Sequence, residues 1–123
     1  MIEDDLEKFT VLKEAHTLVL MIYRASNSFP PSEDFGLTSQ IRRAAVSIPS
    51  NIVEGKARGS QKDYKRFVLI ARGSLEEVKY QLFLAKELNY LPSESYSQIR
   101  SQADYVGRLV NGLLKSINRD IAS

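Results

Sequence analysis

The segment from Gln40 to Arg58, QIRRAAVSIPSNIVEGKAR, decides how this chain folds. With about 100° of rotation per residue, it predicts a helix whose first face is apolar and packs into a core. That face consists of Leu37, Ile41, Ala44, Ala45, Ile48, Ile52 and Gly55. A second face is a polar line that consists of Arg43, Ser47, Ser50, Asn51, Glu54 and Arg58. Pro49, in the middle of the segment, removes one helix hydrogen bond and is expected to bend the axis.

The same helix carries a third strip, again apolar, that consists of Val46, Val53 and Ala57. A surface helix of a monomer needs only one apolar stripe. A matching strip on the far side of the third predicted helix contains Leu69, Tyr80 and Leu84. Such strips, left exposed on several helices, would form patches that soluble monomers seldom tolerate. The sequence therefore predicts a homo-oligomer with these six residues in its interface.

Apolar periodicity predicts helices at residues 5–28, 34–57, 61–89 and 93–118, within a single domain of residues 1–123. The short connections make neighbouring helices antiparallel, so the expected fold is an all-α four-helix bundle. The expected core stripe of the first helix is Phe9, Leu12, Val19, Tyr23 and Ser26. In the fourth helix it is Ile99, Ala103, Val106, Val110, Leu113 and Ile117. Between the second and third helices, Gly59 suits the left-handed position after a helix, and Ser60 begins an approximate capping box.

Composition excludes several classes of protein. The 123 residues contain no cysteine, which rules out disulfides and thiolate metal sites and suits the reducing cytoplasm. The N-terminal residues are acidic and contain no apolar run, so we expect no signal peptide. The longest apolar run, Leu18 to Tyr23, is far too short to cross a membrane, and we expect no membrane partner.

The net charge of +2 conceals an asymmetry along the chain. Residues 1–34 have seven acidic and three basic residues, whereas residues 42–72 have eight basic and two acidic residues. A concentrated basic segment suits an anionic partner such as a nucleic acid, and it equally suits an acidic patch on a neighbouring subunit. The candidate nucleic-acid-binding residues are Arg43, Arg58, Lys65, Arg72 and Lys79.

No pattern in the sequence supports catalysis or a metal cofactor. Di-iron bundles need paired Glu-x-x-His motifs on facing helices, and His16 is the only histidine. We expect His16 to be a packed, hydrogen-bonded side chain. We predict no catalytic residues, no metal site and no cofactor.

Two features have both a structural and a functional interpretation. The polar line contains Glu54 and Arg58 as an i, i+4 pair, and Ser50 and Asn51 can bond the backbone near Pro49. It is therefore a local network, an interface network or an exposed ligand surface. A basic stripe of the third helix recurs every seven residues at Lys65, Arg72, Lys79 and Lys86. Its side chains either cover the core edge and pair with acids of other helices, or present a surface for phosphates.

Several motifs carry a resemblance to a known family. The first motifs are FP at Phe29–Pro30, FGL at Phe35–Leu37 and, after them, RRAAVSIPSNIVEGKAR. Two more follow later in the chain, IARGSLEE (residues 70–77) and ELNYL (residues 87–91). Together they resemble the bacterial four-helix-bundle proteins encoded in intervening sequences of 23S ribosomal RNA genes, over roughly residues 9–117. The family usually has Ala at the position of Val53. The resemblance implies a left-handed up-down-up-down bundle, assembly as a ring of five subunits, and no catalytic residues.

These observations lead to two functional hypotheses. The first is a non-enzymatic homo-oligomer, a pentameric ring by resemblance, that binds RNA or another nucleic acid through its basic surface. The alternative is a structural or scaffold oligomer that binds a protein partner through its pore or rim. The sequence does not name the RNA, the protein or the cellular process.

Overall fold

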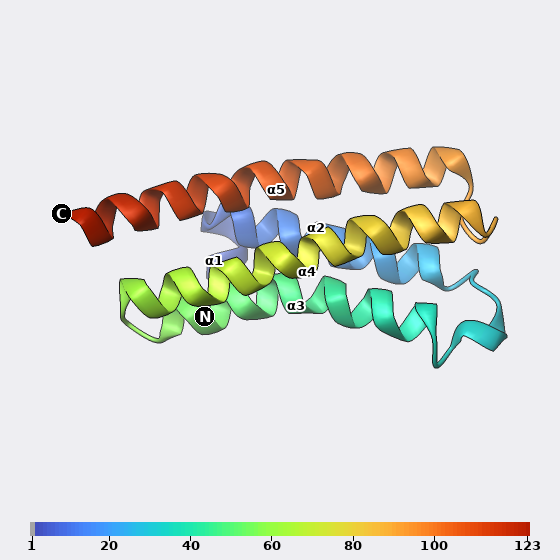
Figure 1. Ribbon diagram of the computed structural model, residues 1–123, viewed down its shortest axis with the longest axis horizontal. Helices are drawn as coiled ribbons and strands as arrows, with labels where there is room; N and C mark the ends of the chain where they lie inside the picture. The colour runs from blue at the N-terminus through green and yellow to red at the C-terminus, as the bar shows by residue number, and fades with distance from the viewer. Residues whose placement is uncertain (1) are drawn as a thin grey trace.

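The computed structural model describes residues 2–123 apart from the side chain of Glu7; Met1, part of the predicted domain, lies outside the described residues. Its elements are α1 (Ile2–Lys8), α2 (Thr10–Ser26), the 3-10 turn η1 (Pro31–Glu33), α3 (Leu37–Ala57), α4 (Gln61–Glu87) and α5 (Ser93–Ala122). The described residues contain no strand. The four long helices lie side by side (Figure 1), which confirms the all-α bundle.

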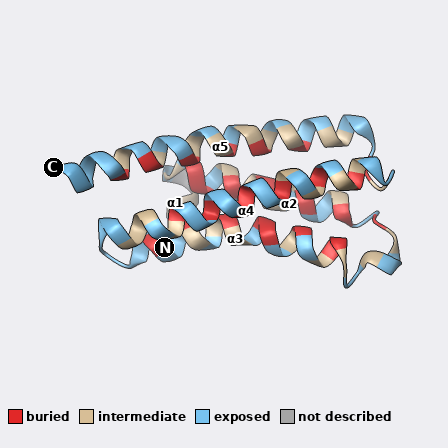
Figure 2. Ribbon diagram, in the orientation of Figure 1, coloured by how far each residue is buried: buried red, intermediate tan, exposed pale blue. Residues whose placement is uncertain are grey.

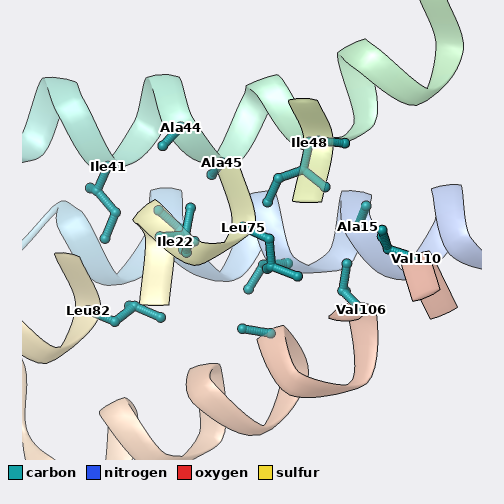
Figure 3. Packing of buried hydrophobic residues seen from close by; sticks show 14 of the residues in the cluster. Ala15, Ile22, Ile41, Ala44, Ala45, Ile48, Leu75, Leu82, Val106 and Val110 are labelled. Atoms are coloured by element: carbon teal, nitrogen blue, oxygen red, sulfur yellow. The ribbon is translucent and has the colours of Figure 1, made fainter. Parts of the chain in front are cut away.

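Each long helix has two neighbours, because α3 contacts α2 and α4 while α5 contacts α4 and α2. The buried face of every helix points into the space between them (Figure 2). Branched and small side chains from all four helices interdigitate there, including Ile22, Ile48, Leu75 and Val106 (Figure 3). All seven residues predicted for the core face of α3 are buried.

The N-terminal segment differs from the single helix that we predicted for residues 5–28. Phe9 leaves the helical region, with φ of −109° and ψ of 96°, and separates α1 from α2. Hydrogen bonds continue on both sides of it, from Phe9 N to Asp5 O (2.8 Å) and from Lys13 N to Phe9 O (3.0 Å). The helix axis therefore changes direction without a proline or glycine to mark the site. Among the helices, α1 contacts α2 alone.

The core stripe of α2 was predicted only in part, because Leu12 and Ser26 are buried as expected but Tyr23 is not. Its buried residues are Val11, Leu12, Ala15, Leu18, Ile22 and Ser26. Val19 lies at the core edge, and Tyr23 is 40% exposed with the guanidinium of Arg42 4.7 Å from its ring centroid. The buried face combines Leu12 and Ser26 of the predicted stripe with residues outside it, namely Val11, Ala15, Leu18 and Ile22. On α5, Leu114 is buried, whereas the predicted Leu113 packs at the core edge.

The ends of the helices agree only in part with those predicted from the sequence, because local hydrogen bonds determine where each helix begins and ends. Before α3, the predicted helix start at residue 34 is replaced by η1, and Glu33 Oε1 accepts from Leu37 N at 3.0 Å. The predicted turn before α4 is confirmed, because Gly59 has φ of 79° and Ser60 Oγ accepts from Asp63 N at 3.3 Å. At the other end of α4, Asn89 has φ of 63°, and the helix ends at Glu87. The α5 helix continues to Ala122, beyond the predicted end at residue 118.

Candidate nucleic-acid interface

The central part of the polar line joins α3 to α4. Ser47 Oγ and Ser74 Oγ are 2.8 Å apart. Asn51 Nδ2 donates to Ser47 Oγ (2.9 Å) and to Ser47 O (2.7 Å). Ser74 is 7% exposed and was not predicted, because a serine among apolar positions carries no signal for a partner on another helix. For Ser47 and Asn51, the structure shows a helix–helix network.

Arg43 lies beside this network, at a surface hollow of about 420 Å³ between α3 and α4. The hollow is lined by Gln40, Arg43, Ala44, Ser47, Ser74, Glu77 and Gln81. Arg43 is exposed and forms no ion pair within the described part of the chain. It therefore remains available to an anionic group, although Glu77 on the other rim opposes one.

The two ends of the polar line point elsewhere. Arg58 Nη2 pairs with Glu54 Oε1 at 2.7 Å, but both side chains are about half exposed, so the pair contributes little stability. The guanidinium of Arg58 also lies 5.0 Å from the ring centroid of Phe67. Ser50 lines an apolar hollow of about 500 Å³ with His16, at the junction of α1, α2 and α3. His16 is exposed, so the prediction of a packed histidine is wrong.

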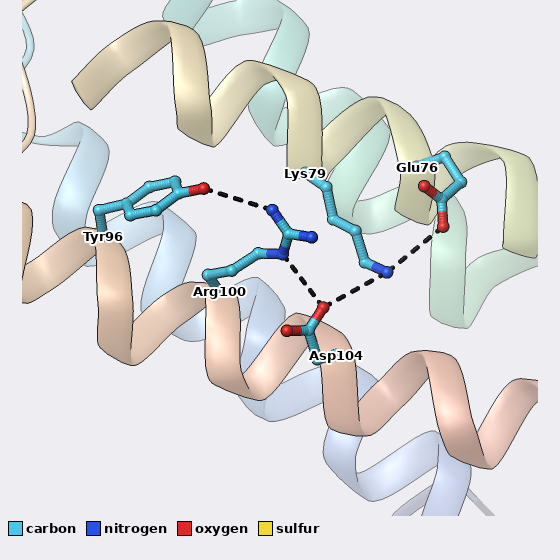
Figure 4. A network of polar contacts seen from close by, with 5 residues as sticks. All are labelled: Glu76, Lys79, Tyr96, Arg100 and Asp104. Carbon is cyan, nitrogen blue, oxygen red and sulfur yellow. Dashed lines mark hydrogen bonds and ion pairs between the residues drawn. The ribbon is translucent and has the colours of Figure 1, made fainter. Parts of the chain in front are cut away.

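Lys79 belongs to a polar network between α4 and α5 (Figure 4). Its Nζ lies 3.3 Å from Glu76 Oε1 and 3.5 Å from Asp104 Oδ1, and its side chain is only 18% exposed. Asp104 Oδ1 also accepts from Arg100 Nε at 3.0 Å. Burial alone would raise the pKa of Asp104, but the hydrogen bond from Arg100 and the two nearby cations lower it below its usual value. Lys79 thus follows the structural interpretation of the basic stripe, in which its side chains pair with acids of other helices.

Lys65 and Arg72 share the side of α4 that Lys79 occupies, because they precede it by two and one heptads. Arg72 is exposed and Lys65 is half-buried, and neither forms an ion pair with a described residue. Arg43 faces the opposite flank of α4, where Ser74 meets α3. The five candidate cations are thus divided between two sides of α4 and do not converge on one site.

The two apolar strips also lie on different faces. Val53 of α3 is 38% exposed and shares its hollow with Leu12 and His16 of α2, so the α3 strip faces the α2 side. Tyr80, 63% exposed, represents the strip on the outer side of α4. The other strip residues are also exposed, except Leu84, which is half-buried against the core.

Within residues 2–123, no three His, Asp or Glu side chains come together as a metal site would require. No helix in the same range has the length and apolar character needed to cross a membrane.

The chain is similar to proteins of one known family and to a solved structure. The model of the 23S rRNA-intervening sequence protein family matches residues 7–112. A crystal structure of a protein with unknown function from the S23 ribosomal protein family of Bacteroides thetaiotaomicron is 24% identical, with a TM-score of 0.77. The match covers 86% of this chain and 99% of that one, and at this identity it supports the fold alone. A comparison with curated proteins gave no match. Since the family model spans most of its length, the chain belongs to the 23S rRNA-intervening sequence protein family.

Proposed function

We propose that this protein is a non-enzymatic homo-oligomer that binds the phosphate backbone of RNA through α4. The observation that carries the proposal is the row of Lys65 and Arg72, which have no ion pair in the described residues and lie within a segment of net charge +6. Lysine and arginine that neutralise phosphates release counterions and so supply affinity without sequence preference. Arg43 lies on the opposite flank of α4 and Arg58 pairs with Glu54, so these two candidates add positive charge without joining the row.

Self-association follows from the apolar strips. Because the α3 strip and the α4 strip lie on different faces, the contact that buries both is heterologous, with the α3 face of one copy against the α4 face of the next. A heterologous contact that closes forms a ring. We propose a ring of five, the number that the family resemblance implies. Each ring would repeat the basic row in every subunit.

The test is fluorescence anisotropy with a labelled structured RNA, from low to physiological salt. The variant is Lys65→Glu with Arg72→Glu, which leaves Lys79 in its pair with Asp104. We expect wild-type binding to weaken steeply with salt, and the variant to lose binding while its helix content is unchanged. Loss of two phosphate contacts would reduce the slope of log K against log salt by roughly 1.5.

A matched control carries the same charge change on another helix. Lys13→Glu with Arg24→Glu alters two exposed cations of α2 that have no ion pair among the described residues. We expect it to retain most of the affinity. Equal losses in the two double variants would refute this surface. No binding by the wild type at low salt would refute the RNA proposal.

The second candidate is a scaffold that binds another protein. The observation in its favour is the exposed Tyr80, since tyrosine is enriched among the residues that anchor protein interfaces. Two results together would support this function. The wild-type oligomer would not bind RNA at low salt, and it would retain a co-purified protein that is lost from Tyr80→Ala.

A further inference from the structure

Phe35 is the most exposed large apolar side chain in the described residues. Its side chain is 100% exposed, whereas the next highest value is the 63% of Tyr80. It therefore packs against nothing in its own subunit. A phenyl ring held entirely in water is unfavourable for an isolated molecule, and it indicates a surface that is covered in an assembly.

The loop that presents Phe35 is braced. The ring of Phe29, which is buried, lies 5.8 Å from the ring of Tyr90, centroid to centroid. Tyr90 Oη donates to Glu33 Oε2 at 3.0 Å, and Glu33 Oε1 accepts from Leu37 N at 3.0 Å. The loop thus holds Phe35 in place before any partner arrives, which reduces the entropy lost on binding.

The two ends of the bundle have opposite charge. The loops at the Phe35 end, residues 27–36 and 86–94, contain Glu33, Asp34, Glu87 and Glu94 against Lys86, a net charge of −3. The α3–α4 turn lies at the opposite end (Figure 1). Residues 54–66 around it have five basic and two acidic residues, a net charge of +3. Two acids of other helices also reach this end, because Asp5 of α1 lines a hollow with Lys56, and Asp120 of α5 accepts from Gln61 Nε2 at 2.8 Å. They reduce the positive charge around the turn, and its remaining excess opposes the negative charge of the Phe35 end.

The basic end also has a hollow. It has a volume of about 260 Å³ and is lined by Gly55, Lys56, Gly59, Ser60, Gln61 and Tyr64. The two glycines carry no side chain into it, and Tyr64 provides an aromatic wall. Lys56 Nζ lies 4.6 Å from the ring centroid of Phe9, so its ammonium already contacts one aromatic ring. A cation beside a second ring would add a favourable cation–π contact.

We propose that copies of this chain associate end to end, with Phe35 of one copy seated in the α3–α4 hollow of the next. Asp34 beside Phe35 then faces the basic residues around the hollow, of which Lys62 is exposed and has no ion pair in the described part of the chain. The contact is heterologous and does not close on itself, so it lengthens the assembly along the bundle axis. Neither Phe35 nor the residues that line the hollow belong to the apolar strips, and the contact is tested on protein without nucleic acid because Arg58 and Lys65 lie near the same turn.

The experiment is sedimentation velocity on nucleic-acid-free protein over a range of concentrations, at low and at physiological salt. The wild type should form larger species as concentration rises, and salt should dissociate them because the ends attract by charge. Phe35→Ser should weaken this association about 30-fold, the loss typical of an aromatic anchor. Its thermal unfolding should match that of the wild type, because the side chain is fully exposed.

Two further variants make the result specific. Phe83→Ser removes a partly exposed phenylalanine of α4 and should leave end-to-end association unchanged. Lys62→Glu at the opposite end should weaken it as Phe35→Ser does. The proposal would be overturned if the size of the wild-type species did not change with concentration and salt, or if Phe35→Ser associated as strongly as the wild type. Sensitivity to Phe35→Ser without sensitivity to Lys62→Glu would overturn the assignment of the hollow and place Phe35 against another surface of the neighbouring copy.

Discussion

At Gly55, α3 packs closely against Tyr64 and Phe67 of α4, and Gly55→Ala tests that contact. A Cβ added at Gly55 would lie 2.7 Å from Phe67 Cβ, 3.2 Å from Tyr64 Cδ1 and 3.3 Å from Tyr64 O. The first of these distances is shorter than real Cβ contacts allow. Two of the three opposing atoms are a Cβ and a backbone oxygen, so no flexible side-chain tip can move aside. The helices themselves would have to separate.

Two effects of opposite sign determine the magnitude. Alanine is favoured over glycine within a helix by about 1 kcal/mol. Overpacking of a close contact costs about 1–3 kcal/mol, and the need to move backbone places this case near the upper value. We therefore expect a net loss of about 2 kcal/mol in the free energy of unfolding. For a chain of this size, about 4 °C per kcal/mol converts the loss to a decrease of about 8 °C in Tm.

The measurement is thermal unfolding followed by circular dichroism at low protein concentration. Gly73→Ala is the matched control, because nothing lies within 4 Å of a Cβ added there and Gly73 is exposed within α4. It should gain about 0.5–1 kcal/mol from helix propensity alone. A Tm for Gly55→Ala equal to or above that of the wild type would show that helix propensity outweighs the clash, and the reasoning would be refuted.

Three further predictions concern pairing, ionisation and assembly. Asp104→Asn weakens the pairing with Lys79 and should cost about 1 kcal/mol, measured by urea unfolding at pH 7. Because the pKa of Asp104 is lowered in the fold, its contribution is present above pH 4 and lost on further acidification, so the difference should vanish at low pH. Burial raises the pKa of Tyr64 to about 12, so the wild type should lose stability relative to Tyr64→Phe between pH 10 and 12; parallel pH profiles would contradict this. Val46→Glu with Val53→Glu should dissociate the oligomer with helix content unchanged, and light scattering that shows a monomeric wild type would contradict the interface.

The helices of the second half of the molecule could be predicted closely from the sequence. Gly59 permits the left-handed backbone that ends one helix, and Ser60 supplies the oxygen that begins the next. All seven residues predicted for the core face of α3 are buried and only Thr38 was missed, because the apolar residues form one dominant stripe and the small residues Ala44 and Gly55 fit close helix contacts. These are local effects of backbone conformation and helical period, and neighbouring residues suffice to specify them.

The sequence was insufficient where two local solutions have similar energy. On α2, apolar residues lie on more than one side of the helix, and only contact with α3 and α5 buries Leu18 and leaves Tyr23 partly exposed. At Phe9, neither proline nor glycine marks the break between α1 and α2. Hydrogen bonds continue on both sides of the break, so the sequence contains no local signal for it. Asn89 adopts positive φ at the end of α4, a position where glycine is the usual signal.

The sequence by itself determined the helical class, the number of long helices, the apolar strips and the placement of basic charge along the chain. Only the tertiary structure decided which charges are available. Lys79 and Arg72 belong to the same heptad row, yet Lys79 pairs with Asp104, which is 25 positions away on α5, while Arg72 has no such partner in the described chain. The exposure of Phe35 also appears only in the tertiary structure, where Tyr90 bonds Glu33 two positions before it and no side chain covers the ring. The physical reason is that period and propensity act between residues a few positions apart, whereas pairing and exposure depend on which helices the fold brings together.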